Sequence, residues 1–222
     1  MTFIGMMAFN EVQAADMPAN PVDKPGYTLD YADEFNGDSL DKSKWTDYYL
    51  PHWSKNPENA KANYRFENGC LVEYITKDQQ AWSPEHDGTV KSSAIMSFDK
   101  SWIHNFSGTM DNQDRNTWYG YKTKYGYFEI RAKLANCGGG GHQAWWMVGM
   151  QQDTNDWFNS KQTGEIDILE TFLVHQMLGE QLHMAGMIRI FKQVGGLIKM
   201  QFHREIQQRS FIFMQWIGHQ IV

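Results

Sequence analysis

The 222-residue sequence has no apolar run as long as a membrane-spanning helix, only two cysteines, and fewer basic than acidic residues. A membrane span needs about 20 consecutive apolar residues, so the first absence excludes an integral helical membrane protein. Cys70 and Cys137 alone cannot build a disulfide scaffold or a cysteine-rich zinc module. The formal net charge of −6 argues against a nucleic-acid-binding protein, which needs a basic surface.

Aromatic residues are plentiful instead, with nine Trp, ten Tyr and thirteen Phe. A chain of this length and apolar content suits one compact domain. Short segments with alternating apolar residues and turn signals between them predict strands, the last of which ends near residue 172. These segments are 27–35, 63–76 with an Asn-Gly turn, 93–98, 125–134, 143–150 and 164–172. The pattern predicts an all-β sandwich or jelly roll.

The N-terminus resembles the end of a secretory signal peptide, although the usual basic residues before it are missing. An apolar run at residues 2–9 is followed by small residues at 12–15. We therefore expect residues 1–15 to be a signal-peptide remnant and the protein to be secreted, periplasmic or extracellular. A frayed terminal tail is the alternative. If the chain is exported, Cys70 and Cys137 form either a disulfide or two separate core thiols.

Composition changes abruptly after residue 172. Residues 1–172 contain 28 Asp plus Asn, whereas residues 173–222 contain none and also lack Pro, Thr and Tyr. Reading residues 200–216 from the third base of each codon is compatible with a sequence that restores Asp, Pro, Thr and Tyr. We expect an out-of-frame tail at 173–222 after a domain at 16–172, which would leave the jelly roll incomplete at its C-terminus. A separate helical appendage is the alternative.

Three carboxylates lie close together in the strand predicted at 164–172. Alternate residues of a strand share a face, so Glu165 and Asp167 would point one way and Ile166 the other. Strict alternation would put Glu170 on the opposite face. A β-bulge, which inserts one extra residue, would return Glu170 to the face of the other two acids.

Crowded carboxylates suit a retaining glycosidase, which needs one ionised and one protonated carboxyl group about 5–5.5 Å apart. This chemistry predicts Glu165 as the nucleophile and Glu170 as the acid/base. Asp167 would hydrogen-bond the nucleophile and help to set its charge. A solvated acidic strand face and a calcium site are the alternatives.

Four motifs in order resemble glycoside hydrolase family 16. The strand above matches the bulged ExDxxE signature of that family. The other three motifs are DEFNGDSLD followed by KW at 33–45, YGYFEIRAKL at 125–134 and AWWM at 144–147. The resemblance covers residues 27–172. It implies an all-β jelly-roll sandwich of two curved antiparallel sheets with a concave glycan cleft. It also implies endo-acting, retaining hydrolysis of a β-1,3-glucan, a mixed-linkage glucan or a galactan.

The resemblance also implies substrate-binding residues. Trp146 corresponds to a Trp that either stacks on a sugar or packs in the core, and Trp118 precedes the strand beside the cleft. His142 replaces a Trp of the family glucanases, which weakens the case for a plain β-1,3-glucan and leaves a galactan or decorated glycan open. A loop histidine without a role is the alternative. No organic cofactor is expected. The resemblance allows a structural calcium ion, but no set of calcium ligands is identified in this sequence. We expect a monomer whose partner is the polysaccharide.

Two further hypotheses remain at this point. A glycan-binding module would keep the cleft and bind without turnover, although three intact carboxylates argue against it. An inactive fragment would result if the residues after 172 left sheet edges exposed and removed part of the core.

Overall fold

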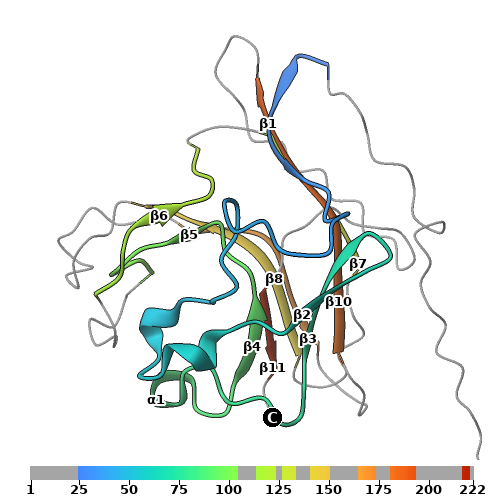
Figure 1. Cartoon of the computed structure of the whole chain (residues 1–222). Helices are drawn as coiled ribbons and strands as arrows, with labels where there is room; N and C mark the ends of the chain where they lie inside the picture. Colours follow the sequence, from blue (N-terminus) through green and yellow to red (C-terminus); the bar gives the residue numbers. More distant parts are fainter. Residues whose placement is uncertain are drawn as a thin grey trace, which may run out of the picture.

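The computed structural model describes residues 25–104, 114–123, 127–133, 141–150, 165–173, 181–193 and 217–220. Within these ranges nearly every element is a short strand, and helix is limited to single turns (Figure 1). The strands are β1 (Tyr27–Asp33), β2 (Tyr64–Glu67), β3 (Cys70–Ile75), β4 (Lys91–Ala94), β5 (Phe98–Asp99), β6 (Trp118–Tyr119), β7 (Tyr127–Lys133), β8 (Gly141–Val148), β9 (Glu165–Leu173), β10 (Gln181–Gln193) and β11 (Ile217–Gln220). The helical turns are η2 (Pro51–Trp53), η3 (Pro57–Ala60) and α1 (Pro84–Asp87).

The strands form two main antiparallel sheets and a small ribbon. The larger sheet runs β1-β10-β3-β2, with β7 paired to β10, and the smaller sheet runs β4-β11-β8-β9. Strands β5 and β6 pair separately. This arrangement confirms the predicted all-β sandwich.

Two strands, β10 and β11, lie after residue 172, near which the sequence predicted the last strand to end. Strand β10 pairs with β3 through residues 181–185, with β1 through 188–193 and with β7 along the other edge. Strand β11 pairs with both β4 and β8. The expectation that strands end near residue 172 is therefore wrong. Ladder hydrogen bonds join main-chain groups, so composition could not exclude strand pairing.

The β2–β3 hairpin forms at the Asn-Gly pair that the sequence indicated. Glu67 pairs with Cys70, and the two residues between them have positive φ angles of 53° for Asn68 and 71° for Gly69. Two successive left-handed residues define the type I′ turn, in which Gly avoids a steric penalty.

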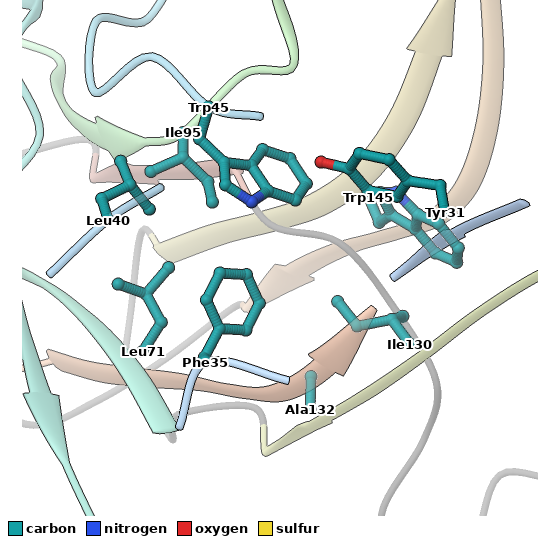
Figure 2. Close-up of a cluster of buried hydrophobic side chains, with 9 residues drawn as sticks. All are labelled: Tyr31, Phe35, Leu40, Trp45, Leu71, Ile95, Ile130, Ala132 and Trp145. Carbon is teal, nitrogen blue, oxygen red and sulfur yellow. The ribbon is translucent and has the colours of Figure 1, made fainter. Parts of the chain in front are cut away.

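The main core lies between the two sheets, because its side chains come from strands of both (Figure 2). Trp145 of β8 is 2% exposed and packs in one cluster with Leu71 of β3 and Ile130 of β7. The other buried members are Tyr31, Phe35, Leu40, Trp45, Ile95 and Ala132. Trp45 also donates a 2.8 Å hydrogen bond from Nε1 to Asp33 Oδ2, which satisfies the polar atom of this buried indole.

Candidate active site

The predicted bulge is present in β9. Trp145 pairs with Leu169, but the next residue of β8, Trp146, pairs with Asp167, so Ile168 is the extra residue. Ile168 packs against the core between the sheets, whereas the neighbouring Asp167 is exposed.

The bulge puts three acidic positions in register with one face of β8. Glu165, Asp167 and Glu170 pair with Val148, Trp146 and Ala144, respectively. These three partners alternate along β8 and therefore share a face, and residues paired across an antiparallel ladder lie on the same side of a sheet. The side chains of Glu165 and Glu170 lie outside the described residues, so this argument rests on the backbone register.

A second aromatic cluster packs on part of the acidic face of the smaller sheet. Ala144 of β8 and Ala94 of β4 are buried beneath Trp53, Trp82 and Ile103, and Trp146 and Val148 pack against this cluster. Trp145 points to the opposite side, into the core between the sheets. The acidic positions therefore lie on the face of the sheet that turns away from the main core.

The structure brings two of the three predicted sugar-binding residues onto the acidic face. Trp146 is half-buried and pairs with Asp167, and His142 lies four residues before it on the same face of β8. Trp118 instead lies in β6, paired with Asp99 of β5, outside the sheet that carries the acids. Of the two tryptophans predicted to bind sugar, only Trp146 therefore lies on the acidic face.

His104 is a residue at this site that the sequence analysis did not identify. Its ring centroid lies 4.8 Å from that of Trp146 and 5.9 Å from that of Trp53. Trp53 in turn stacks on Trp82 at 5.6 Å. The segment around His104 has no family motif or alternating pattern, so no local signal pointed to it.

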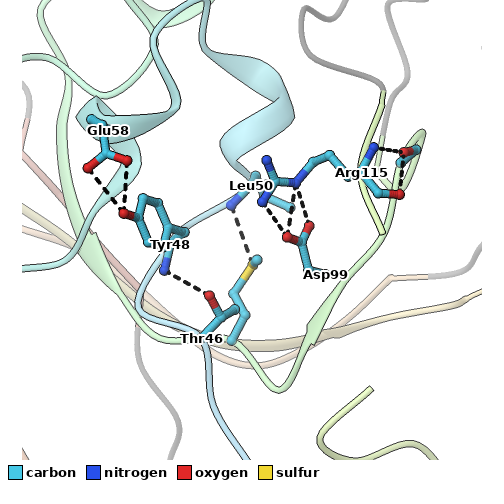
Figure 3. A network of polar contacts seen from close by, with 8 residues as sticks. Thr46, Tyr48, Leu50, Glu58, Asp99 and Arg115 are labelled. Carbon is cyan, nitrogen blue, oxygen red and sulfur yellow. Dashed lines mark hydrogen bonds and ion pairs between the residues drawn. The ribbon is translucent and has the colours of Figure 1, made fainter. Parts of the chain in front are cut away.

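The segment that carries His104 is tied to the domain at two points. His52 Nε2 lies 2.7 Å from the carbonyl oxygen of Ile103, and the Arg115 backbone N–H donates a 2.9 Å hydrogen bond to Ser101 Oγ. Arg115 also forms a forked ion pair with Asp99, which Figure 3 shows beside Leu50 and Tyr48. These contacts hold the segment from Asp99 to His104, and Arg115 further along the chain, close to the aromatic cluster.

Burial keeps both histidines of this region uncharged at neutral pH. Desolvation lowers the pKa of His52 to about 4, and it lowers the pKa of His104 to about 4 as well. A neutral imidazole can share one N–H and present a flat ring face, so these side chains act here by packing and hydrogen bonding.

The remaining sequence predictions concern residues that the structure describes in part. Cys70 is buried with Sγ 3.8 Å from the Asn68 carbonyl oxygen, while Cys137 and residues 1–15 lie outside the described residues. Among the described side chains, no group of three or more His, Cys, Asp or Glu residues could hold a metal ion. No helix in the same part of the chain is long and apolar enough to cross a membrane.

No family model matches the chain, but it is similar to a curated protein and to a solved structure. Glucan endo-1,3-beta-glucosidase A1 of Niallia circulans is 30% identical over 152 residues, which cover 65% of this chain and 20% of that protein. The solved structure of the GlcNAcα1-4Gal releasing endo-β-galactosidase from Clostridium perfringens matches with a TM-score of 0.67 at 50% identity. That match covers 93% of this chain and 65% of the other. The chain thus spans a fifth of the curated relative and slightly less than two thirds of the solved one.

Proposed function

Because the chain belongs to glycoside hydrolase family 16, we propose that it is an endo-acting, retaining β-glycoside hydrolase of a polysaccharide or glycan chain. The observation that carries the proposal is the register of β9, in which one bulge aligns Glu165, Asp167 and Glu170 with alternate residues of β8. The names of both relatives support it, since each describes an endo-acting glycosidase.

The mechanism is a double displacement. Glu165, as a carboxylate, attacks the anomeric carbon while Glu170 protonates the departing glycosidic oxygen. Glu170 then takes a proton from the water that hydrolyses the glycosyl-enzyme, and both residues return to their starting states. Asp167 lies between them in the register, and we assign it the role of holding Glu165 ionised through a hydrogen bond.

The separation of Glu165 and Glu170 along the sheet is compatible with their roles as nucleophile and acid/base. Their partners on β8 are four residues apart, which corresponds to about 13 Å along a strand. Strand β8 bends along its length (Figure 1). On a curved face, long side chains from the two ends of this span can converge on one glycosidic bond.

We propose a β-galactoside as the substrate class. The endo-β-galactosidase is 50% identical and covers 93% of this chain, whereas the glucanase is 30% identical and covers 65%. His142 adds a second argument, because an imidazole hydrogen-bonds hydroxyl groups where the family glucanases offer an indole for stacking. Hydrolysis of β-1,3-glucan is the second candidate, favoured by the curated relative.

The decisive experiment measures reducing-end release from matched substrates. The panel contains a glycan with GlcNAcα1-4Gal at its end, a plain β-galactan, β-1,3-glucan and mixed-linkage glucan. We expect release from the first, with the anomeric configuration retained in the initial product. Activity on β-1,3-glucan alone would reverse the assignment of substrate.

The nucleophile is tested with Glu165→Gln, whose isosteric amide cannot attack. We expect a loss of at least ~10³-fold in kcat/KM, within the range for removing a catalytic group. Glu85→Gln, an exposed substitution in α1, is the control and should keep full activity. A Glu165→Gln protein that binds glycan while the wild type also releases no product would favour the binding-module hypothesis.

We also propose that the polypeptide is exported and acts as a monomer. The apolar run at 2–9 and the small residues at 12–15 support cleavage after residue 15. Mass spectrometry of the N-terminus after secretion, and light scattering of the purified protein, test the two statements. An uncleaved N-terminus in the exported protein would contradict the first, and a dimer mass the second.

A further inference from the structure

We propose that His104 is a positioning residue, which fixes the ring of Trp146 on the acidic face so that this ring stacks on one sugar of the substrate. The inference rests on the proposed function and extends it to a residue that lies outside the family motifs. It concerns substrate binding, and assigns His104 no part in proton transfer.

Trp146 supplies an accessible aromatic surface on the acidic face. Its backbone pairs with Asp167, the middle acidic position, and its side chain is half-buried, so part of the indole remains accessible. A sugar bound over the acids would therefore meet this ring. An indole held in one orientation loses less conformational freedom on binding than one that rotates.

His104 supplies that orientation from the side. Its ring lies 4.8 Å from Trp146 at an interplanar angle of 50°. The same imidazole is stacked on Trp53 at 5.9 Å and 26°. It thus links a ring at the acidic face to a ring of the buried cluster.

The backing behind His104 is rigid. Trp53 is 7% exposed and is stacked on Trp82, which is 1% exposed. The carbonyl group next to His104 in the chain, that of Ile103, lies 2.7 Å from His52 Nε2. Movement of the His104 ring would therefore disturb a packed and hydrogen-bonded neighbourhood.

The backbone of this segment is held in an uncommon conformation. Trp102 has φ 64° and His104 has φ 53°, both in the left-handed region that non-glycine residues rarely adopt. Such conformations persist where the surrounding structure determines them, and they gather at functional sites. The left-handed turn at His104 is consistent with a side chain whose direction matters.

The experiment compares three variants of the full chain in steady-state hydrolysis of the glycan that carries GlcNAcα1-4Gal. His104→Ala removes the ring, and His104→Phe keeps a flat ring of similar size. His86→Ala is the matched control, because the His86 ring meets the edge of the same Trp53 ring from α1, at 6.0 Å.

We expect His104→Ala to raise KM roughly three- to tenfold, the value of one aromatic contact, with kcat changed less than twofold. His104→Phe should return KM to near the wild-type value, and His86→Ala should leave it unchanged. A merely structural role would instead lower the melting temperature of the His104 and His86 variants alike and leave KM unaffected.

The proposal is overturned if His104→Ala leaves KM unchanged, or if His104→Phe is as impaired as His104→Ala. Binding of the same glycan to Glu165→Gln and to Glu165→Gln/His104→Ala, measured by calorimetry, separates this inference from the proposed function. Weaker binding by the double variant supports the inference even if the wild type hydrolyses nothing. Equal binding, or none by either protein, overturns it.

Discussion

Glu73 places a carboxyl group inside the sandwich, where a charge is costly. It lies on β3, is 2% exposed, and its Oε1 has no hydrogen-bond partner among the described residues. Desolvation raises its pKa well above 4.5, partly offset by a hydrogen bond from the backbone N–H of Ile95. The folded protein therefore holds a proton on Glu73 at pH values where the unfolded chain has lost it.

The sign of the resulting pH dependence follows directly. Above pH 4.5 the native state binds more protons than the unfolded state, so this group makes stability fall as pH rises toward its folded pKa. Glu73→Gln keeps an acceptor for the Ile95 N–H and does not ionise. We expect it to gain on the order of 1–3 kcal/mol at pH 7, because folding of the variant no longer requires a buried carboxylate to take up a proton.

Urea denaturation at pH 4 and pH 7 checks this prediction. The gain should be present at pH 7 and nearly absent at pH 4, where the carboxyl group is mostly neutral in the unfolded state and neutral in the folded state. Glu85→Gln on the exposed turn α1 is the control and should change neither value. A loss of stability at pH 7 would mean that the ionised carboxylate has a partner beyond the described residues.

His52 gives a pH dependence of the opposite sign. Its side chain is fully buried, and burial lowers its pKa from 6.5 to about 4. Between these values the unfolded state binds the proton and the native state does not, so stability falls as pH falls from 6.5 toward 4. The full effect is roughly 3 kcal/mol.

His52→Gln tests this, because a glutamine amide can donate to the Ile103 carbonyl oxygen without titrating. Below pH 6.5 we expect the stability of the variant to fall less steeply than that of the wild type, with His104 supplying part of the remaining slope. Thermal melts at half-unit intervals of pH measure it. Parallel profiles for the two proteins would refute the assignment.

At the scale of single elements, the bulge in β9 makes a sharp prediction. Removing Ile168 leaves the sequence Glu-Ile-Asp-Leu-Glu, which alternates strictly and keeps all three acids in register with Val148, Trp146 and Ala144. Inserting one alanine after Ile168 also restores strict alternation, but it moves Glu170 to the position opposite His142, about 7 Å further along the same face and away from the other two acids.

We therefore expect the Ile168 deletion to retain measurable hydrolysis and the alanine insertion to lose ~10²–10⁴-fold, as for loss of a general acid. The deletion also removes a side chain packed on the core, which costs about 1–3 kcal/mol of stability. Reducing-end assays and melting temperatures on both proteins separate the two effects. An inactive but folded deletion variant would contradict the register argument.

The elements also show how far sequence reasoning reaches. Strand β7 follows the predicted alternation, with Ile130 and Ala132 buried in the core. Alternation is predictable because successive residues of a strand point to opposite faces of the sheet, one of them toward the core. The bulge in β9 was predictable because three acids in one strand make chemical sense only on one face. Glu129, whose side chain lies on the face of β7 opposite to Ile130, is only 6% exposed, since burial from outside a sheet leaves no mark on alternation.

Other features were beyond local patterns. Strand β10 owes its place to pairing with β1, β3 and β7, and those partners are distant in sequence. His104 joins Trp146 through a turn whose left-handed angles carry no sequence signature in a Trp-Ile-His segment. Both are tertiary outcomes, so the composition of their own segments could not reveal them.

For the whole molecule, we propose that residues 173–222 are read from a shifted frame and that residues 16–172 carry the in-frame domain. The complete loss of Asp, Asn, Pro, Thr and Tyr after residue 172 supports this. The alternative hypothesis, that this chain is an inactive fragment, is tested by comparing the chain with a frame-restored protein. Genomic sequence across codons 170–175 that keeps the present frame would refute the proposal.

A frame-restored protein is expected to melt at least about 5 °C above the chain as it stands, if β10 and β11 gain well-packed side chains worth a few kcal/mol. Its reducing-end release should rise in parallel. Differential scanning calorimetry and the hydrolysis assay on both proteins measure this. Equal melting temperatures and activities would show that the present tail already supports the sandwich.

The position of β11 between β4 and β8 has a consequence for the order in which the protein comes into being. About seventy residues separate β8 from β11, so a ribosome working at roughly 5–20 residues per second needs several seconds to deliver the strand that joins the two. During that interval β4 and the β8–β9 pair, which bears the acidic positions, lack the strand that joins them. The smaller sheet is thus completed only after synthesis has passed residue 220.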